Sequence, residues 1–206
     1  MKDKRRTVGN ILIIIGAVLL LSATGLFLYN VISNNKQAED SLELTRSAKE
    51  KIENDESDLP ADSGETDRSG DSEDFSELMP VDIEGYPCDG YLSIPAIDLE
   101  MAVLDTWNRD YLRKTICRYY GSPYTHDFVV AGHNYRSSFG KLKSLSQGDD
   151  IYFTDMNGRV FHYVVRQTEV LDGTAIDEML SGGWDLSLYT CTYGGQSRFT
   201  VRCEEV

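Results

Sequence analysis

The sequence contains few of the residues that metal centres and nucleic-acid surfaces require. It has three histidines and four cysteines, and no two cysteines show C-x-x-C spacing. This argues against a structural zinc site, and the scattered acids do not follow the ligand spacing of a calcium loop. Basic residues are also scarce, 20 against 34 acids, so the formal net charge is −14. We therefore expect no metal, no cofactor and no nucleic-acid partner.

Charged side chains are absent from Val8 to Ile32, a run dominated by Ile, Leu, Val, Ala and Gly. At ~1.5 Å rise per residue the run can cross a hydrocarbon core of ~30 Å with some tilt. The alternative is a secretory signal peptide, whose apolar region is normally only ~7–15 residues long and ends at a small-residue cleavage site. We expect an uncleaved transmembrane anchor at residues 8–32, in the lipid bilayer. The basic residues among residues 1–7 predict a cytoplasmic N-terminus and an outer location for the rest of the chain.

Aromatic residues are nearly absent from residues 33–84, which carry 17 acids against five bases. Such a segment buries too little apolar surface to offset its ordering entropy, so we predict an acidic, flexible stalk. Within it, Lys36 to Glu53 is rich in helix formers and carries thinly spaced apolar residues, Leu42, Leu44 and Ile52. These features predict a transient or packed helix in this part of the stalk.

Residues 85–206 have the opposite composition, with aromatic and β-branched residues in short runs separated by Gly, Asp, Asn and Pro. Short helices are predicted from Asn108 through Ile116 and at Thr174–Leu180, and a hairpin turn at Asn157-Gly158. The pattern predicts a mostly β domain, either a sandwich or a closed barrel. The predicted strands are Gly90–Ile94, Leu99–Leu104, Phe128–His133, Asp150–Thr154, Arg159–Leu171, Leu186–Cys191 and Arg198–Glu204.

A Gly-Gly pair near the C-terminal end predicts a tight hairpin. Gly194 and Gly195 lie between two β-like runs, and a two-residue turn needs positive φ at both positions. In this register Cys191 faces Arg198, with Cβ atoms ~4.5–5.5 Å apart. Alternation then predicts two faces. The inner face carries Leu186, Leu188, Phe199, Val201 and Cys203, and the outward face carries Tyr189, Cys191, Arg198 and Arg202.

A guanidinium beside a thiol has chemical consequences. The cation favours the thiolate, which is the nucleophilic form of Cys191, and Arg198 offers permanently charged donors to a developing oxyanion. The alternative is that Arg198 only solvates its strand and that Cys191 is a small half-buried residue. Arg202 lies on the same face about 13 Å further along and is a poor substitute.

The other three cysteines are weaker candidates for a nucleophile. Cys203 faces the predicted core, and neither Cys88 nor Cys117 has a comparable charged neighbour in the sequence. One disulfide, for example between Cys88 and Cys117, is compatible with a location outside the membrane, but the sequence does not determine it.

A cysteine nucleophile that forms an acyl-enzyme needs a proton donor for the leaving amine, and histidine titrates nearest to neutral pH. His162 lies inside an apolar strand, and His126 lies in a turn. His133 ends the apolar run Phe128–Gly132, so a strand would deliver it to the edge of a sheet. Position therefore favours His133.

Several short motifs occur in a fixed order in the outer domain. They are Ala131-Gly132-His133-Asn134, Phe139-Gly140-Lys141-Leu142, and Leu188-Tyr189-Thr190-Cys191 followed by Arg198. This order resembles that of the sortase family, in which a Gly-His motif ends one strand, a Thr-Leu-x-Thr-Cys motif ends a later one and an Arg opens the last strand. The resemblance covers residues 85–206 and also the layout of anchor, stalk and catalytic domain. At Ser187 the family usually has Thr.

The resemblance implies a closed, eight-stranded β-barrel with short helices, in which His133, Cys191 and Arg198 are catalytic and Thr190 contributes to substrate binding. It also implies a cysteine transpeptidase. Cys191 would attack the backbone carbonyl of a Thr in the C-terminal sorting signal of a surface protein. The thioester would then pass to an amine of a peptidoglycan precursor or a pilin, outside the membrane of a Gram-positive-type envelope.

The sortase subclass stays open at this point. Gly-His-Asn, Phe-Gly-x-Leu and Cys-Thr-Tyr look like class B, but class B members carry a long helical insert that does not fit between Leu171 and Leu186. The stretch Tyr119-Tyr120-Gly121-Ser122 is more similar to classes A and D.

Two other functions compete with this interpretation. A papain-like peptidoglycan hydrolase also uses Cys and His, but there the nucleophile normally precedes the histidine and lies at a helix start. A membrane-anchored extracellular binding domain without catalysis would need no convergence of Cys191, His133 and Arg198.

Overall fold

The computed structural model describes residues 2–57 and 77–206, and the chain divides into two units, Met1–Lys36 and Gln37–Val206. Helix α1 (Lys2–Ser57) runs through the first unit and continues into the second. In the first unit its large apolar side chains are exposed, for example Leu21 at 74% and Phe27 at 66%. Among the described residues α1 is the one helix long and apolar enough to cross a membrane. The anchor at residues 8–32 stays a prediction, for which this helix is a candidate.

The part of α1 that belongs to the second unit packs against the β domain. Leu44, Ala48 and Ile52 follow one another at intervals of four residues, which places them on one face of the helix, and all three are buried. Thr45 on the same segment accepts a hydrogen bond from the backbone N–H of Ala102 at 2.8 Å. The residues that pack with this face are Ile83, Cys88, Ala102, Leu104, Cys117 and Met156.

The prediction of a flexible stalk over residues 33–84 is therefore wrong for residues 37–57, which form a packed helix, and for strand β1 (Val81–Ile83). The packed helix was one of the two forms expected for Lys36 to Glu53. Counting apolar residues alone underestimates how much of this segment is buried, because Gln37, Ser41 and Thr45 are buried as well. Gln37 Nε2 donates to the Leu112 carbonyl, Ser41 Oγ lies 3.1 Å from Thr115 Oγ1, and Thr45 accepts from Ala102, so these residues add to the packed face. Residues 58–76 of the predicted stalk lie outside the described residues.

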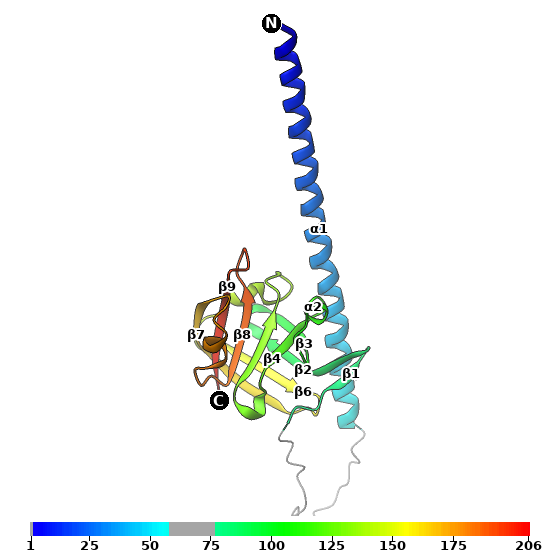
Figure 1. Ribbon diagram of the computed structural model, residues 1–206. Coiled ribbons are helices and arrows are strands. Elements are labelled where there is room, and N and C mark those ends of the chain that lie inside the picture. The colour runs from blue at the N-terminus through cyan, green and yellow to red at the C-terminus, as the bar shows by residue number, and fades with distance from the viewer. Residues whose placement is uncertain (1, 58–76) are drawn as a thin grey trace, which may run out of the picture. The chain divides into compact units, whose positions relative to one another are not determined.

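Eight strands of the second unit close into a barrel (Figure 1). Strand β6 pairs with β7 and also with β2, which completes a ring in the order β2-β3-β4-β5-β8-β9-β7-β6, and β1 pairs with β2 outside the ring. Closure removes the free edges of these strands and confirms the eight-stranded barrel. The strands are β2 (Tyr86–Ile94), β3 (Leu99–Leu104), β4 (Ile116–Tyr120), β5 (Phe128–Gly132), β6 (Asp150–Asp155), β7 (Val160–Asp172), β8 (Leu186–Cys191) and β9 (Ser197–Glu205).

The connections contain two short α-helices, α2 (Arg109–Leu112) and α3 (Ile176–Leu180), and three 3₁₀ turns. Asn108 caps α2 as predicted, because its side chain accepts from the backbone N–H of Asp110 and of Tyr111. The predicted continuation of this helix to Ile116 is wrong, since β4 starts at that residue between β3 and β5. The 3₁₀ turns are η1 (Pro95–Ile97), η2 (Pro123–Thr125) and η3 (Phe139–Ser144).

All four cysteines are free thiols. Cys88 of β2 and Cys117 of β4 both pair with Leu104 of β3, from opposite sides. Two strand spacings separate their backbones, roughly 10 Å, and a disulfide spans at most ~7 Å between Cα atoms. The disulfide that the sequence permitted is therefore not formed.

Candidate active site

Three neighbouring strands bring the three predicted catalytic residues together. β5 and β8 are parallel neighbours, and Gly132 pairs with Thr190. The next residues, His133 and Cys191, therefore lie level with each other, about one strand spacing or roughly 5 Å apart along the sheet. β9 is antiparallel to β8 on its other side and pairs Arg198 with Cys191. The nucleophile candidate thus lies between the histidine and the arginine.

The outer face of the barrel carries this group. Ala131 and Tyr189 lie two positions before His133 and Cys191, and they form an outer cluster with Met179 of α3. Side chains alternate along a strand, so His133 and Cys191 take the same face. The thiol of Cys191 is half-buried on the outer face.

The C-terminal hairpin has the predicted register but a longer turn. The pairs from Leu186 with Cys203 to Cys191 with Arg198 are those expected. The backbone N–H of Thr192 donates to the Ser197 carbonyl at 2.9 Å, so the loop comprises residues 193–196 and the two-residue turn is wrong. Gly194 and Gly195 do adopt positive φ, 88° and 72°. The predicted inner face is confirmed, with Leu186, Leu188, Val201 and Cys203 in the main core and Phe199 packed against it.

The side chain of Arg198 is oriented by the hairpin itself. Its Nη1 donates to the carbonyl oxygen of Gly195 at 2.9 Å and to that of Ser197 at 3.2 Å. Asp172 lies nearby, and hydrogen bonds from Thr174, with a smaller contribution from Arg198, lower the pKa of that carboxyl group. The carbonyls hold one end of the guanidinium in place on the strand that pairs with that of Cys191.

His133 lies in a partly dehydrated and electropositive environment. Burial lowers the pKa of its imidazole below 6.5, and the positive charge of Arg113 lowers it further. Its ring packs against Tyr135, with centroids 4.9 Å apart. Both effects on the pKa, burial and the charge of Arg113, favour the uncharged form of the imidazole.

Aromatic side chains line the outer face next to Cys191. The ring of Tyr119 meets that of Tyr189 edge to face at 5.4 Å and that of Trp107 at 6.2 Å. A small cavity of about 30 Å³ lies between this aromatic wall, Ile176 of α3 and Arg198. An apolar wall of this kind, two residues along β8 from Cys191, can hold part of an extended peptide.

The remaining histidines have other partners. The Nδ1 of His126 lies 3.3 Å from an Asp185 carboxylate oxygen and 3.2 Å from one of Glu205. His126 and Asp185 precede β5 and β8, at the ends of these strands that lie away from His133 and Cys191. The Nε2 of His162 lies 2.8 Å from Asp150, and its ring stacks on Tyr152.

The remaining cysteines are buried. Burial raises the pKa of the thiols of Cys88, Cys117 and Cys203 to about 12, so they stay protonated. Cys191 differs from them in being only partly buried.

Thr190 is placed differently from the rest of the predicted site. Its side chain is fully buried, and its pairs with Gly132 and Phe199 put it on the sheet face opposite that of Cys191. It therefore does not line the outer surface with the other three residues.

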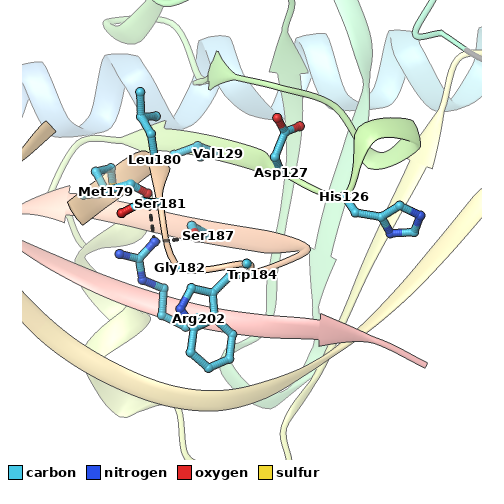
Figure 2. A pocket seen from close by; sticks show the side chains of 11 residues that line it. His126, Asp127, Val129, Met179, Leu180, Ser181, Gly182, Trp184, Ser187 and Arg202 are labelled. Carbon is cyan, nitrogen blue, oxygen red and sulfur yellow. Dashed lines mark hydrogen bonds between the residues drawn. The ribbon is translucent and has the colours of Figure 1, made fainter. Parts of the chain in front are cut away.

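Arg202 shares the outward face of β9 with Arg198, as predicted, but it is 2% exposed. Figure 2 shows its guanidinium between Ser187 and the backbone of Met179, under residues that connect β7 to β8. Local pattern does not predict this burial, because the covering segment comes from a different part of the chain. In the ranges 2–57 and 77–206, no group of three or more His, Cys, Asp or Glu side chains is arranged to hold a metal ion.

Comparison with known proteins identifies the family of this chain. The model of the sortase domain matches residues 92–206. Sortase A from Corynebacterium diphtheriae is 25% identical with a TM-score of 0.54, and the match covers 59% of this chain and 61% of that chain. Sortase C of Streptococcus pneumoniae is 26% identical with a TM-score of 0.52, covering 58% and 66%. Sortase C1 from Streptococcus agalactiae is 29% identical with a TM-score of 0.50, covering 57% and 66%.

The match thus spans about 61–66% of the length of these three structures. These structures are sortases A and C, so they do not support the resemblance of the motifs to class B. No curated protein matches the sequence significantly. The domain match over more than half of the chain, with the closed barrel and these structural matches, shows that the protein belongs to the sortase family.

Proposed function

We propose that this protein is a membrane-anchored cysteine transpeptidase with Cys191 as nucleophile, His133 as acid and base, and Arg198 as oxyanion stabiliser. The observation that carries the proposal is the placement of these residues level with one another on the outer ends of β5, β8 and β9. Membership of the sortase family supports it independently.

These three side chains can account for every proton and bond in the proposed acyl transfer. The Cys191 sulfur attacks the peptide carbonyl carbon while its proton passes to the neutral imidazole of His133. The guanidinium of Arg198 stabilises the tetrahedral oxyanion. The C–N bond then breaks, and the imidazolium gives its proton to the leaving amine. An incoming amine attacks the thioester, His133 takes its proton, and collapse restores the free thiol.

The proposed acyl donor is a Thr-containing sorting signal of a surface protein, and the proposed acceptor is an amine of a peptidoglycan precursor or a pilin. The structure of the sortase C from Streptococcus pneumoniae is described in terms of pilin substrate specificity, which supports this kind of partner. We also propose that the catalytic domain lies outside the membrane with the N-terminus in the cytoplasm. The apolar part of α1 and the basic residues before it support this orientation.

The test uses the full chain in detergent micelles with a library of Thr-containing pentapeptides and hydroxylamine as the simplest amine acceptor. We expect an acyl adduct on Cys191 and a peptide hydroxamate, both detected by mass spectrometry. Cys191→Ala should give neither, whereas Cys203→Ala, which removes a buried thiol, should keep both. If Cys191→Ala still cleaves the peptides, the proposal is refuted. If no cysteine is selectively labelled by a thiol probe and no peptide is cleaved, a binding domain without catalysis is favoured.

A further inference from the structure

Arg202 is a buried cation with no place in the chemistry described above. It lies on β9 opposite Ser187 of β8, on the same face as Arg198 and Cys191. It is 2% exposed and is the largest of the fully buried side chains in the part of the protein that the structure describes. Burying a guanidinium is costly unless charge and hydrogen-bonding partners compensate, so its contacts indicate what it stabilises.

The contacts of Arg202 join three parts of the domain. Nε lies 2.7 Å from a carboxylate oxygen of Glu169 on β7, and Nη1 donates to Ser187 Oγ at 2.8 Å. Nη1 also donates to the carbonyl of Met179 at 2.9 Å, and Nη2 donates to that of Glu178 at 2.6 Å. One side chain therefore ties α3 to two strands of the barrel.

The two carbonyls belong to the last turn of α3, where a helix has no N–H groups of its own left to satisfy them. α3 is only five residues long and cannot persist without tertiary support. We call residues 173–185, between β7 and β8, the α3 segment. At its start, the N–H of Gly173 donates to the Gln196 carbonyl at 2.8 Å. At the far end of the helix, Arg202 supplies the donors.

Apolar packing alone does not hold the far part of the segment. A cavity of about 160 Å³ separates Gly182 to Trp184 from Val129 and Ser187 of the sheet, with Arg202 at its margin (Figure 2). Gly182 and Gly183 both have positive φ, 119° and 66°, which glycine adopts without strain. The position of α3 on the sheet, which we call its seating, therefore depends strongly on Arg202 and on Met179.

The α3 segment covers the surface that leads to Cys191. Met179 packs on Val129, Ala131 and Tyr189 of the outer face. Ile176 lines the small cavity together with Tyr189 and Arg198. Since Tyr189 lies two residues before Cys191, a peptide bound along this face must meet α3.

We infer that Arg202 is a positioning residue that seats α3 on β8 and β9 and thereby shapes the wall against which the acyl-donor peptide binds. The part of this inference that concerns the peptide rests on the proposed function. The seating of α3 does not. Arg202 acts through α3 and does not touch the reacting atoms.

Hydrogen exchange tests the seating without any substrate. In the full chain in detergent micelles, Arg202→Met should accelerate exchange of the Met179 and Ser181 amides, which hydrogen-bond within α3, at least tenfold. Arg166→Met is the matched control. It removes an arginine of the neighbouring strand that pairs with the exposed Glu204, and it should leave exchange of these amides unchanged. If both amides exchange at the wild-type rate in folded Arg202→Met, the inference that Arg202 seats α3 is refuted.

Steady-state kinetics test the role in binding. With the pentapeptide from the library that reacts fastest, Arg202→Met should raise KM about tenfold and change kcat less than about twofold. Arg202→Lys, which keeps one charged contact to Glu169, should recover part of this loss. If Arg202→Met fails to fold, Met179→Ala removes the same wall with Arg202 intact and should give the same rise in KM. A change in kcat alone, or an unchanged KM in both variants, overturns this role. If no peptide reacts, the proposed function fails while the exchange result still decides the seating.

Discussion

The packing of α1 against the barrel gives a quantitative prediction. Leu44 is 3% exposed and packs against the β domain, whereas Leu42, two residues earlier on the same helix, is 61% exposed. Leu44→Ala deletes three buried carbon atoms at ~0.8 kcal/mol each and leaves a cavity, so it should lower the free energy of unfolding by about 2–4 kcal/mol. Leu42→Ala removes the same atoms from an exposed site and should cost about 0.5 kcal/mol or less.

Urea and thermal unfolding of the full chain in detergent micelles measure this difference. Both tryptophans, Trp107 and Trp184, lie in the second unit, so their fluorescence reports on unfolding of the β domain. For a unit of this size, 1 kcal/mol corresponds to about 2–4 °C, and Leu44→Ala should lower Tm by about 5–15 °C. Equal and small effects of the two substitutions would mean that residues 37–57 do not support the β domain, and would refute the reasoning.

Three further predictions concern the catalytic group. Arg198→Met should reduce the rate of acyl-enzyme formation ~10²–10³-fold with a smaller change in KM, in single-turnover kinetics followed by mass spectrometry; an effect confined to KM would count against oxyanion stabilisation. The pKa of His133 is lowered, so kcat/KM should rise with pH through an apparent pKa below 6.5, and Arg113→Met should move this limb to higher pH because a nearby positive charge is lost. An acid limb that stays in place in Arg113→Met would contradict this cause. Gly132→Ala places a Cβ about 2.6 Å from the ring of Phe139, so it should cost about 1–3 kcal/mol of stability and displace His133, which urea unfolding and activity can both measure; wild-type values of both would contradict it.

The parts of the site that sequence reasoning predicts well are those set by local pattern. The pairing of Cys191 with Arg198 follows from apolar alternation in two consecutive strands joined by a short turn, so both signals lie within about twenty residues of each other. The turn itself was predicted too short, because Thr192 and Ser197 form a further hydrogen-bonded pair. The register was nevertheless predicted correctly, because the pair of Thr192 and Ser197 continues the same pairing that sets Cys191 opposite Arg198.

The features that sequence reasoning missed depend on distant partners. Ile116 and Cys117 follow a capped helix start, but their strand lies between β3 and β5, and neither neighbour is visible from local pattern. The packing of residues 37–57 depends on a sheet that begins more than twenty residues later in the chain. The burial of Arg202 likewise needs Glu169 and the end of α3.

The position of β9 inside the sheet also affects how the protein folds. Strand β9, residues 197–205, pairs with β8 on one side and with β7 on the other, so it lies between them in the ring. The ring therefore cannot close until β9, the last of its eight strands in chain order, takes its place, and the cationic neighbour of the thiol arrives in the same event. A nascent chain that lacks this strand already contains the proposed nucleophile but no complete barrel around it, so completion of the fold and readiness for the proposed acyl transfer should coincide.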